Sequence, residues 1–245
     1  MSSLLVIFFI NLFIFIDLIF AVTYTCDSTA VCGCSAASTV ITSRIVGGES
    51  ASDHAWGWMI SLRHSGRHRC GASLLSSESA VTAAHCVDDD LSNPSALSIV
   101  VGTNDLNDQS SSTFQRRTVV TISMHPNYKS DVYVNDIAII RFSPLTVSLD
   151  SKLAFICLPN VNVDPFGIGD GLVGIGWGYT SESSGRLSNF LQQVTVQTFS
   201  WTSGECQRSG LTNSNVQFCA GISTGGKGKT LLSGIRLCSL FFYWM

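Results

Sequence analysis

Hydrophobic residues along this chain fall into short runs separated by polar residues, and after residue 21 no long segment has the spacing of a helix. Short runs rich in Val, Ile and Leu, bounded by Gly, Ser and Asn, are typical of strands in a sandwich or barrel. The pattern therefore predicts an all-β fold. The expected strands are Trp58–Arg63, Arg69–Ser76, Ala80–Ala84, Leu97–Gly102, Thr118–Ser123, Ile137–Phe142, Leu172–Gly176, Leu191–Thr198 and Val216–Cys219.

A stretch with two prolines divides these strands unevenly. The sequence SPLTVSLDSKLAFICLPN, residues 143–160, has the character of a connection between two halves. Six of the expected strands precede it and only three follow it. The second half is therefore expected to be short.

The start of the chain has the features of an export signal. Its first 21 residues are nearly all apolar and end in Ala21, which is typical of a secretory signal peptide cut after that residue. No Lys or Arg precedes the apolar run, however, and Asn11 and Asp17 interrupt it. The alternative is a membrane-spanning anchor, which the length allows and the charge of Asp17 opposes. The polar residues 22–44 have no strand or helix pattern and are predicted to be a pro-segment or linker.

Charge and cysteine content narrow the partners and the compartment. The net charge is −3, and no run of Lys or Arg offers the basic face that nucleic acids require. Nine cysteines in a chain with an export signal predict disulfides and a secreted, extracellular protein. One thiol must be left over, and we expect it to be Cys238. Cys32 and Cys34 have no matching cluster at zinc spacing, so no metal or cofactor is expected.

Two ionisable residues and one cleavage site are candidates for chemistry. His85 follows an expected strand in a run of small residues, which suits an imidazole that takes and returns a proton, although a buried structural histidine is the alternative. Asp136 stands before the apolar run Ile137–Ile140, where it could orient an imidazole or merely cap the strand. Arg44-Ile45, followed by two glycines, is a candidate site of proteolytic cleavage.

These residues lie in short sequence motifs that together resemble those of the chymotrypsin/trypsin family of secreted serine endopeptidases. The motifs occur in the family's order, and the resemblance covers the chain from Ile45 to about Lys227. They are RIVGG (44–48), CGASL (70–74), TAAHC (82–86), NDIAII (135–140), ICLP (156–159), GWG (176–178) and FCAG (218–221).

The resemblance implies an all-β fold of two six-stranded antiparallel barrels of the chymotrypsin type, with the second barrel incomplete. It divides the chain into a signal peptide, a pro-segment, a protease domain and a tail that departs from the family. Their bounds would be 1–21, 22–44, 45–227 and 228–245, with barrel one at about 45–145 and the partial barrel two at about 160–227.

The resemblance also implies roles for the candidate residues. His85 would be the general base, and Asp136 would hold its tautomer and support the imidazolium. Cutting after Arg44 by another trypsin-like protease would free Ile45, whose ammonium pairs in the family with an Asp before the nucleophilic serine. His68 has a family counterpart that supports the active site structurally.

Disulfides follow from the same resemblance. The first expected pair would brace the loop of His85, and the second would close a loop in the second half. The third would tie the pro-segment to the protease domain, with two other cysteines free to pair locally. The pairs are Cys70–Cys86, Cys206–Cys219, and Cys157 with one of Cys26, Cys32 or Cys34, which the sequence does not decide.

The motif that contains the family's nucleophilic serine, Gly-Asp-Ser-Gly-Gly, does not occur in this sequence. Gly234 stands at the expected place of the serine, and Ser233 lacks the preceding Asp and the following glycines. Leu231 and Leu232 are bulky where backbone N–H groups must face an oxyanion. We therefore expect the chain to be inactive. Codons for residues 229–236 can hide Asp-Ser in another frame, so a frameshift is one explanation of the tail, beside mis-splicing or a genuine product.

Three functions remain open from the sequence. The first is a secreted trypsin-like serine endopeptidase zymogen without its nucleophile region, whose partners would be protein or peptide substrates and an activating trypsin-like protease. The second is a non-catalytic serine protease homologue that acts as a binding or regulatory module. The third is a membrane-anchored interaction protein that uses the N-terminal segment as a span. A membrane contact is expected only if this segment stays uncleaved. A monomer is expected.

Overall fold

The computed structural model describes residues 21–24, 30–35, 37, 39–42, 49–148, 152–161, 167–178, 187–208, 211–221 and 241–244. Three predicted parts lie outside these residues: the signal peptide apart from Ala21, the cleavage site at Arg44 and Ile45, and the tail at 228–245 apart from residues 241–244. Strands dominate the described part of the chain. Its one α-helix is the four-residue α1, Gly204–Gln207, and its three 3₁₀ helices are η1 Ala84–Cys86, η2 Asp88–Asp90 and η3 Pro94–Ala96.

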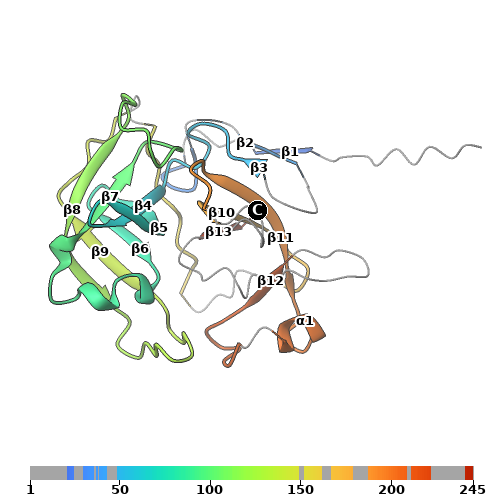
Figure 1. The fold of residues 1–245 in the computed structure, drawn as a ribbon. Helices are drawn as coiled ribbons and strands as arrows, with labels where there is room; N and C mark the ends of the chain where they lie inside the picture. Colours follow the sequence, from blue (N-terminus) through green and yellow to red (C-terminus); the bar gives the residue numbers. More distant parts are fainter. Residues whose placement is uncertain are drawn as a thin grey trace, which may run out of the picture.

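Six antiparallel strands close into a barrel in the first half of the chain (Figure 1). They follow the order β4-β5-β6-β9-β8-β7, and β7 pairs back with β4. Closure removes the exposed strand edges that an open sheet presents. The strands are β4 Met59–His64, β5 Arg67–Ser76, β6 Ser79–Thr82, β7 Leu97–Val101, β8 Gln115–Met124 and β9 Ala138–Phe142.

Aliphatic side chains from every side of the barrel form its core. Leu62, Leu74, Ile99 and Ile140 come from four different strands, and each has 0% of its surface exposed. Burial of such a side chain contributes about 1.5–3 kcal/mol. Along β9 the pattern alternates, with Ile140 buried and Arg141 exposed, as the two-residue period of a strand requires.

The second half forms an open antiparallel sheet beside the barrel (Figure 1). Its order is β12-β11-β10-β13, and β3 also pairs with β11. Within the described residues this sheet does not close on itself. The prediction of an all-β protein with one complete barrel and an incomplete second one is therefore confirmed. The strands are β3 Glu49–Ser50, β10 Gly171–Gly176, β11 Gln192–Phe199, β12 Cys219–Gly221 and β13 Phe241–Trp244.

A shared core joins the two halves. Val173, Ile175 and Trp177 belong to the same buried cluster as the side chains of the barrel. The indole N–H of Trp177 donates to the backbone carbonyl of Asn104 over 2.8 Å, and the backbone N–H of Leu191 donates to the same carbonyl over 2.8 Å. The loop at Asn104 thus ties the barrel to the second sheet.

Two short strands precede both sheets. β1, Ala21–Tyr24, pairs antiparallel with β2, Thr39–Thr42. The prediction that residues 22–44 contain no strand is wrong here. β-Branched residues in both runs favour extended backbone, but four residues are too few to show an alternating pattern without knowledge of the partner.

Other strand predictions differ from the structure at their ends. The strand expected over Ala80–Ala84 stops at Thr82, because the chain then turns into η1. The strand expected over Val216–Cys219 begins only at Cys219 and continues to Gly221. β13 was not predicted at all, and it gives the second half more strands than expected.

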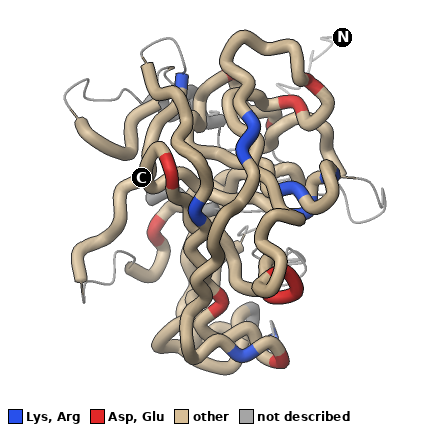
Figure 2. Tube along the Cα trace, turned by 90° about the vertical axis from the view of Figure 1, so that its left-hand side faces the viewer, with Lys and Arg blue, Asp and Glu red and all other residues tan. Residues whose placement is uncertain are grey.

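Charged residues are few and of mixed sign. The chain has 14 Lys and Arg against 17 Asp and Glu, and Figure 2 shows both signs spread over several parts of the trace. In that view the basic residues do not gather into a stripe. In the part of the chain that the structure describes, no helix is long and apolar enough to span a bilayer.

Two glycines with positive φ differ in the space that surrounds them, so substituting each one tests backbone strain with and without a steric clash. Gly66 has φ of +83° and Gly102 has φ of +77°, a region that disfavours other residues. A methyl group on Gly66 would meet nothing within 4 Å, whereas one on Gly102 would overlap the backbone carbonyl of Thr113. We expect Gly66→Ala to lower the free energy of unfolding by about 1–2 kcal/mol, and Gly102→Ala to lower it by at least about 1 kcal/mol more. Urea unfolding of both variants measures the difference, and equal losses would contradict it.

Candidate active site

The register of two barrel strands brings His85 and Asp136 together. β6 pairs antiparallel with β9, and Thr82 is opposite Ala138. His85 lies three residues after Thr82, and Asp136 lies two residues before Ala138. Because the C-terminal end of one antiparallel strand lies beside the N-terminal start of its partner, both residues emerge at the same end of the barrel.

Asp136 holds His85 at two points. Its Oδ1 accepts a hydrogen bond from the backbone N–H of His85 over 2.9 Å, and its Oδ2 lies 2.5 Å from the ring Nδ1. The side chains of His85 and Asp136 are 11% and 4% exposed. The carboxylate therefore fixes both the backbone and the ring of the histidine. This contact suits an imidazole that must keep one orientation and accept a proton at its other nitrogen.

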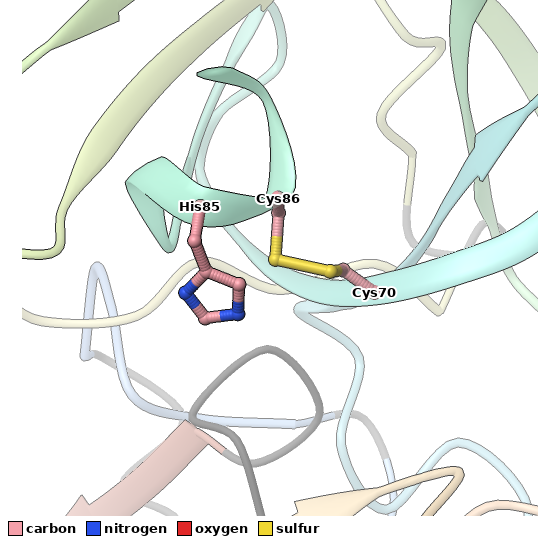
Figure 3. A group of neighbouring side chains, drawn as sticks. All are labelled: Cys70, His85 and Cys86. Carbon is pink, nitrogen blue, oxygen red and sulfur yellow. A yellow bond between two sulfur atoms is a disulfide. The ribbon is translucent and has the colours of Figure 1, made fainter. Parts of the chain in front are cut away.

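A disulfide supports the backbone beside this histidine. η1 carries His85, and Cys86, the next residue, is bonded to Cys70 of β5 (Figure 3). The two sulfurs and a ring nitrogen of His85 lie within 4.8 Å of one another. Because the sulfurs are joined to each other, they are not available as thiolates, and this group is not a metal site.

The loop before Asp136 has an unusual backbone. Tyr133 and Asn135 have φ of +52° and +56°, while Val134 between them is buried. The side-chain amide of Asn135 donates to the carbonyl of Asn127 over 2.9 Å. Left-handed backbone at residues other than glycine persists only where the surroundings impose it. The loop thus presents Asp136 to His85 in one conformation.

Tyr133 also forms one wall of the site. Its ring centroid lies 5.3 Å from that of His85 at an angle of 77°, an edge-to-face arrangement. The Tyr133 side chain remains partly open to solvent, at 41% residue exposure. Sequence reasoning missed this residue. Its position three residues before the candidate carboxylate was the only signal available.

His68 packs at the junction of the two halves. Its Nδ1 lies 2.9 Å from the hydroxyl oxygen of Ser61, and its ring meets that of Trp177 edge to face at 5.4 Å. Burial, together with the charge of Arg63, lowers the pKa of His68 from 6.5 to about 4. The ring is therefore neutral near pH 7. HSGRH, which places His64 and His68 four residues apart, forms a hairpin between β4 and β5 and not a helix.

The structure places the other predicted cysteines as follows. Cys206 at the end of the second half is bonded to Cys219, and Cys157 is bonded to Cys32. Among the three pro-segment candidates for Cys157, the structure thus contains the bond to Cys32. Cys34 is also disulfide-bonded.

The remaining predicted sites lie outside the described residues. These are the cleavage site at Arg44 and Ile45, and the tail positions Ser233, Gly234 and Cys238. The structure therefore brings together the expected base and its carboxylate. The segment where a nucleophile is expected lies outside the described residues.

A closed antiparallel barrel joined to a second antiparallel sheet, with a buried carboxylate that holds an imidazole at the end of the barrel, is the architecture of chymotrypsin-like proteins. A solved structure of human heparin binding protein has the same fold, with a TM-score of 0.65, 23% identity, and coverage of 81% of this chain and 80% of that one.

Sequence comparisons define the family. The Trypsin family model matches residues 45–230. Brachyurin from Leptuca pugilator is 35% identical over 189 residues, which cover 75% of this chain and 76% of brachyurin. The chain belongs to the trypsin family, and the resemblance found in the sequence is confirmed.

Two further relatives are longer proteins. Serine proteinase stubble from Drosophila melanogaster is 34% identical over 198 residues, which cover 75% of this chain but 24% of stubble. Clotting factor G beta subunit from Tachypleus tridentatus is 31% identical over 203 residues, with 76% and 62% coverage. This chain thus spans only part of the length of these two relatives.

The tautomer of His85 tests the contact with Asp136. An ionised carboxylate can only accept hydrogen bonds, so the neutral ring is expected to carry its proton on Nδ1. In Asp136→Asn the amide can donate to Nδ1, and the tautomer protonated on Nε2 should become populated. Long-range proton–nitrogen NMR spectra distinguish the two forms. Asp89→Asn, an exposed neighbour, is the control and should leave the His85 signals in place. A ring protonated on Nε2 in the unmodified chain would refute the assignment.

Stability should depend on pH through His68. Its folded pKa of about 4 lies below the unfolded value of 6.5, so between these values the unfolded chain binds more protons. The contribution of neutral His68 is complete above pH 6.5 and is lost as the pH falls towards 4, by up to about 3 kcal/mol. We expect His68→Gln to have a shallower loss of unfolding free energy between pH 7 and pH 4.5. Parallel curves for the two proteins would contradict this.

Proposed function

We propose that this chain is a secreted zymogen of the trypsin-like serine endopeptidase class and that it does not hydrolyse peptide bonds. His85 is the general base, and Asp136 holds its tautomer and supports the imidazolium. The observation that carries the assignment is the two-point contact of the Asp136 carboxylate with the backbone and ring of His85. Members of the trypsin family act on protein substrates, and the substrates of this chain would belong to that class.

Inactivity is proposed from the sequence. In the family's mechanism the base takes its proton from a serine nucleophile. The motif Gly-Asp-Ser-Gly-Gly, which supplies that serine and the backbone N–H groups that stabilise the oxyanion, is absent from this sequence. Loss of a nucleophile costs several orders of magnitude in rate even when the rest of a site is intact. The base and its carboxylate are therefore expected to be insufficient for turnover.

Secretion and zymogen activation are proposed from the disulfides and the cleavage site. Three disulfides join described cysteines, as is usual in oxidising compartments. Arg44 and Ile45 follow β2, which ends at Thr42, and precede β3, which begins at Glu49. A trypsin-like protease is the expected activator. The bond between Cys32 and Cys157 would keep the pro-segment attached after this cut.

The boundaries of the parts are proposed as well. We assign 1–21 to a signal peptide, 22–44 to a pro-segment, 45–227 to the protease domain and 228–245 to a divergent tail. The alternative function is a non-catalytic serine protease homologue that acts as a binding or regulatory module. Under this alternative the fold is the same, but the protein has no catalytically active form.

Activity measurements test the proposal. After treatment with trypsin and its removal, the chain should neither cleave a chromogenic arginine substrate above background nor react with a fluorophosphonate, which labels activated serines. A chimera in which residues 228–245 are replaced by the C-terminal part of a trypsin-family protease that contains Gly-Asp-Ser-Gly-Gly supplies a serine and should cleave the substrate after the same treatment.

The roles of the described residues are tested in that chimera. His85→Ala should lower kcat/KM by at least about a thousandfold, because the base is lost. Asp89→Asn is the control and should leave kcat/KM unchanged. Turnover or labelling of the unmodified chain would refute its inactivity, and a chimera whose activity survives His85→Ala would refute the role of His85.

A further inference from the structure

The C-terminal strand β13 occupies an edge that the second sheet would otherwise expose. β10 pairs on one side with β11 and on the other side with β13. The register joins Leu172 to Trp244, Val173 to Tyr243, Gly174 to Phe242 and Ile175 to Phe241. We propose that β13 is a sheet-completing strand, donated by the tail of the same chain, and that the tail is for this reason a structural part of the fold.

Burial of β10 makes this edge costly to leave open. Leu172, Val173 and Ile175 each have 0% of their surface exposed. Backbone N–H and C=O groups in such surroundings need partners, and each one left unpaired costs about 1–3 kcal/mol. β13 pairs with four consecutive residues of β10, and alternate residues among them direct their N–H and C=O groups towards it.

The position of β13 adds a second support. β10 and β13 lie side by side between the barrel and β11 (Figure 1). β13 also contacts β5, the barrel strand that carries Cys70. The strand therefore touches both halves of the molecule at their junction. A strand that pairs with one sheet and contacts the other is held more firmly than one at a free edge.

The chain length permits this pairing within one molecule. β12 and β13 are separated by β11 and β10, so about three strand spacings, or about 14 Å, lie between them. The connection over residues 222–240 can span up to about 60 Å. A tethered strand has an effective concentration in the millimolar range, which exceeds that of a second copy in dilute solution. The occupant of this edge is accordingly β13 of the same chain.

The composition of β13 suits a paired strand. Phe, Tyr and Trp are among the residues with the strongest preference for strands, and the sequence Phe-Phe-Tyr-Trp contains no charge, Gly or Pro. An uncharged aromatic strand left unpaired would be a site of aggregation. Its pairing with β10 satisfies one edge of this strand.

Cysteine cross-linking tests the register and the occupant together. Directly opposite residues in antiparallel strands lie at a distance that a disulfide can bridge, whereas a shift of one residue turns the side chain to the other face. In a Cys238→Ser background, Val173→Cys with Tyr243→Cys should give an intramolecular disulfide in most of the monomer on mild oxidation. Val173→Cys with Phe242→Cys is the matched control and should cross-link at least tenfold less.

The products separate the outcomes by non-reducing electrophoresis and mass spectrometry. A cross-linked monomer in the first variant alone supports the proposal. A covalent dimer would mean that the strand pairs with a second copy, which overturns it. Absence of the bond, or equal cross-linking in the two variants, overturns it as well.

Hydrogen exchange gives an independent measurement on the protein without engineered cysteines. In a chain that ends at Leu240, those amides of Leu172–Ile175 that face β13 should exchange at least tenfold faster, while those of β6 and β9 keep their rates. Deletion of Met245 alone is the control and should change neither region. Unchanged exchange in β10 after loss of β13 would refute the sheet-completing role.

Discussion

The pairing of β6 with β9 is the constraint on which the candidate site depends. It places Thr82 opposite Ala138, and the two chains then leave the barrel together, one into η1 and the other from the loop before β9. His85 and Asp136, 51 residues apart, meet because of that register. A slip of one residue would turn every side chain of β9 to the opposite face and bury Arg141 in place of Ile140. The packing of the barrel and the geometry of the site are thus secured by the same pairing.

Covalent and electrostatic contacts then fix the details that the sheet leaves free. The Cys70–Cys86 disulfide links β5 to η1, directly beside His85. The carboxylate of Asp136 accepts from the backbone N–H of His85 and also contacts the ring at Nδ1, so it fixes the position of η1 as well as the orientation of the imidazole. The left-handed residues Tyr133 and Asn135 store strain at the point where this carboxylate is delivered. Such strain is tolerated because a closed barrel on both sides of the loop holds its ends.

Local patterns in the sequence revealed the barrel and the candidate pair, and they failed where a distant partner decides the conformation. Alternation of apolar residues was enough for β9, since its buried and exposed positions follow the two-residue period. The same reasoning extended β6 through Ala84, because small apolar residues have similar patterns in a strand and in a 3₁₀ turn. β1, β2 and β13 have four residues each, and their partners in space are what make them strands. The choice of Cys32 as the partner of Cys157 likewise depends on the docking of the pro-segment, where Gly33 donates to the carbonyl of Phe155.

The two halves of the molecule differ in what they require from the C-terminal region. Both His85 and Asp136 come from the first barrel, whose six strands close without any residue beyond Phe142. The strands that position His85 and Asp136 therefore do not depend on the C-terminal region. The second sheet is different, because β10 is lined on one side by residues from the very end of the chain. A change in the C-terminal strand thus acts first on this sheet, which shares a buried core with the barrel at Ile175 and Trp177. This division explains how the contact between His85 and Asp136 can be intact in a sequence that lacks the motif Gly-Asp-Ser-Gly-Gly.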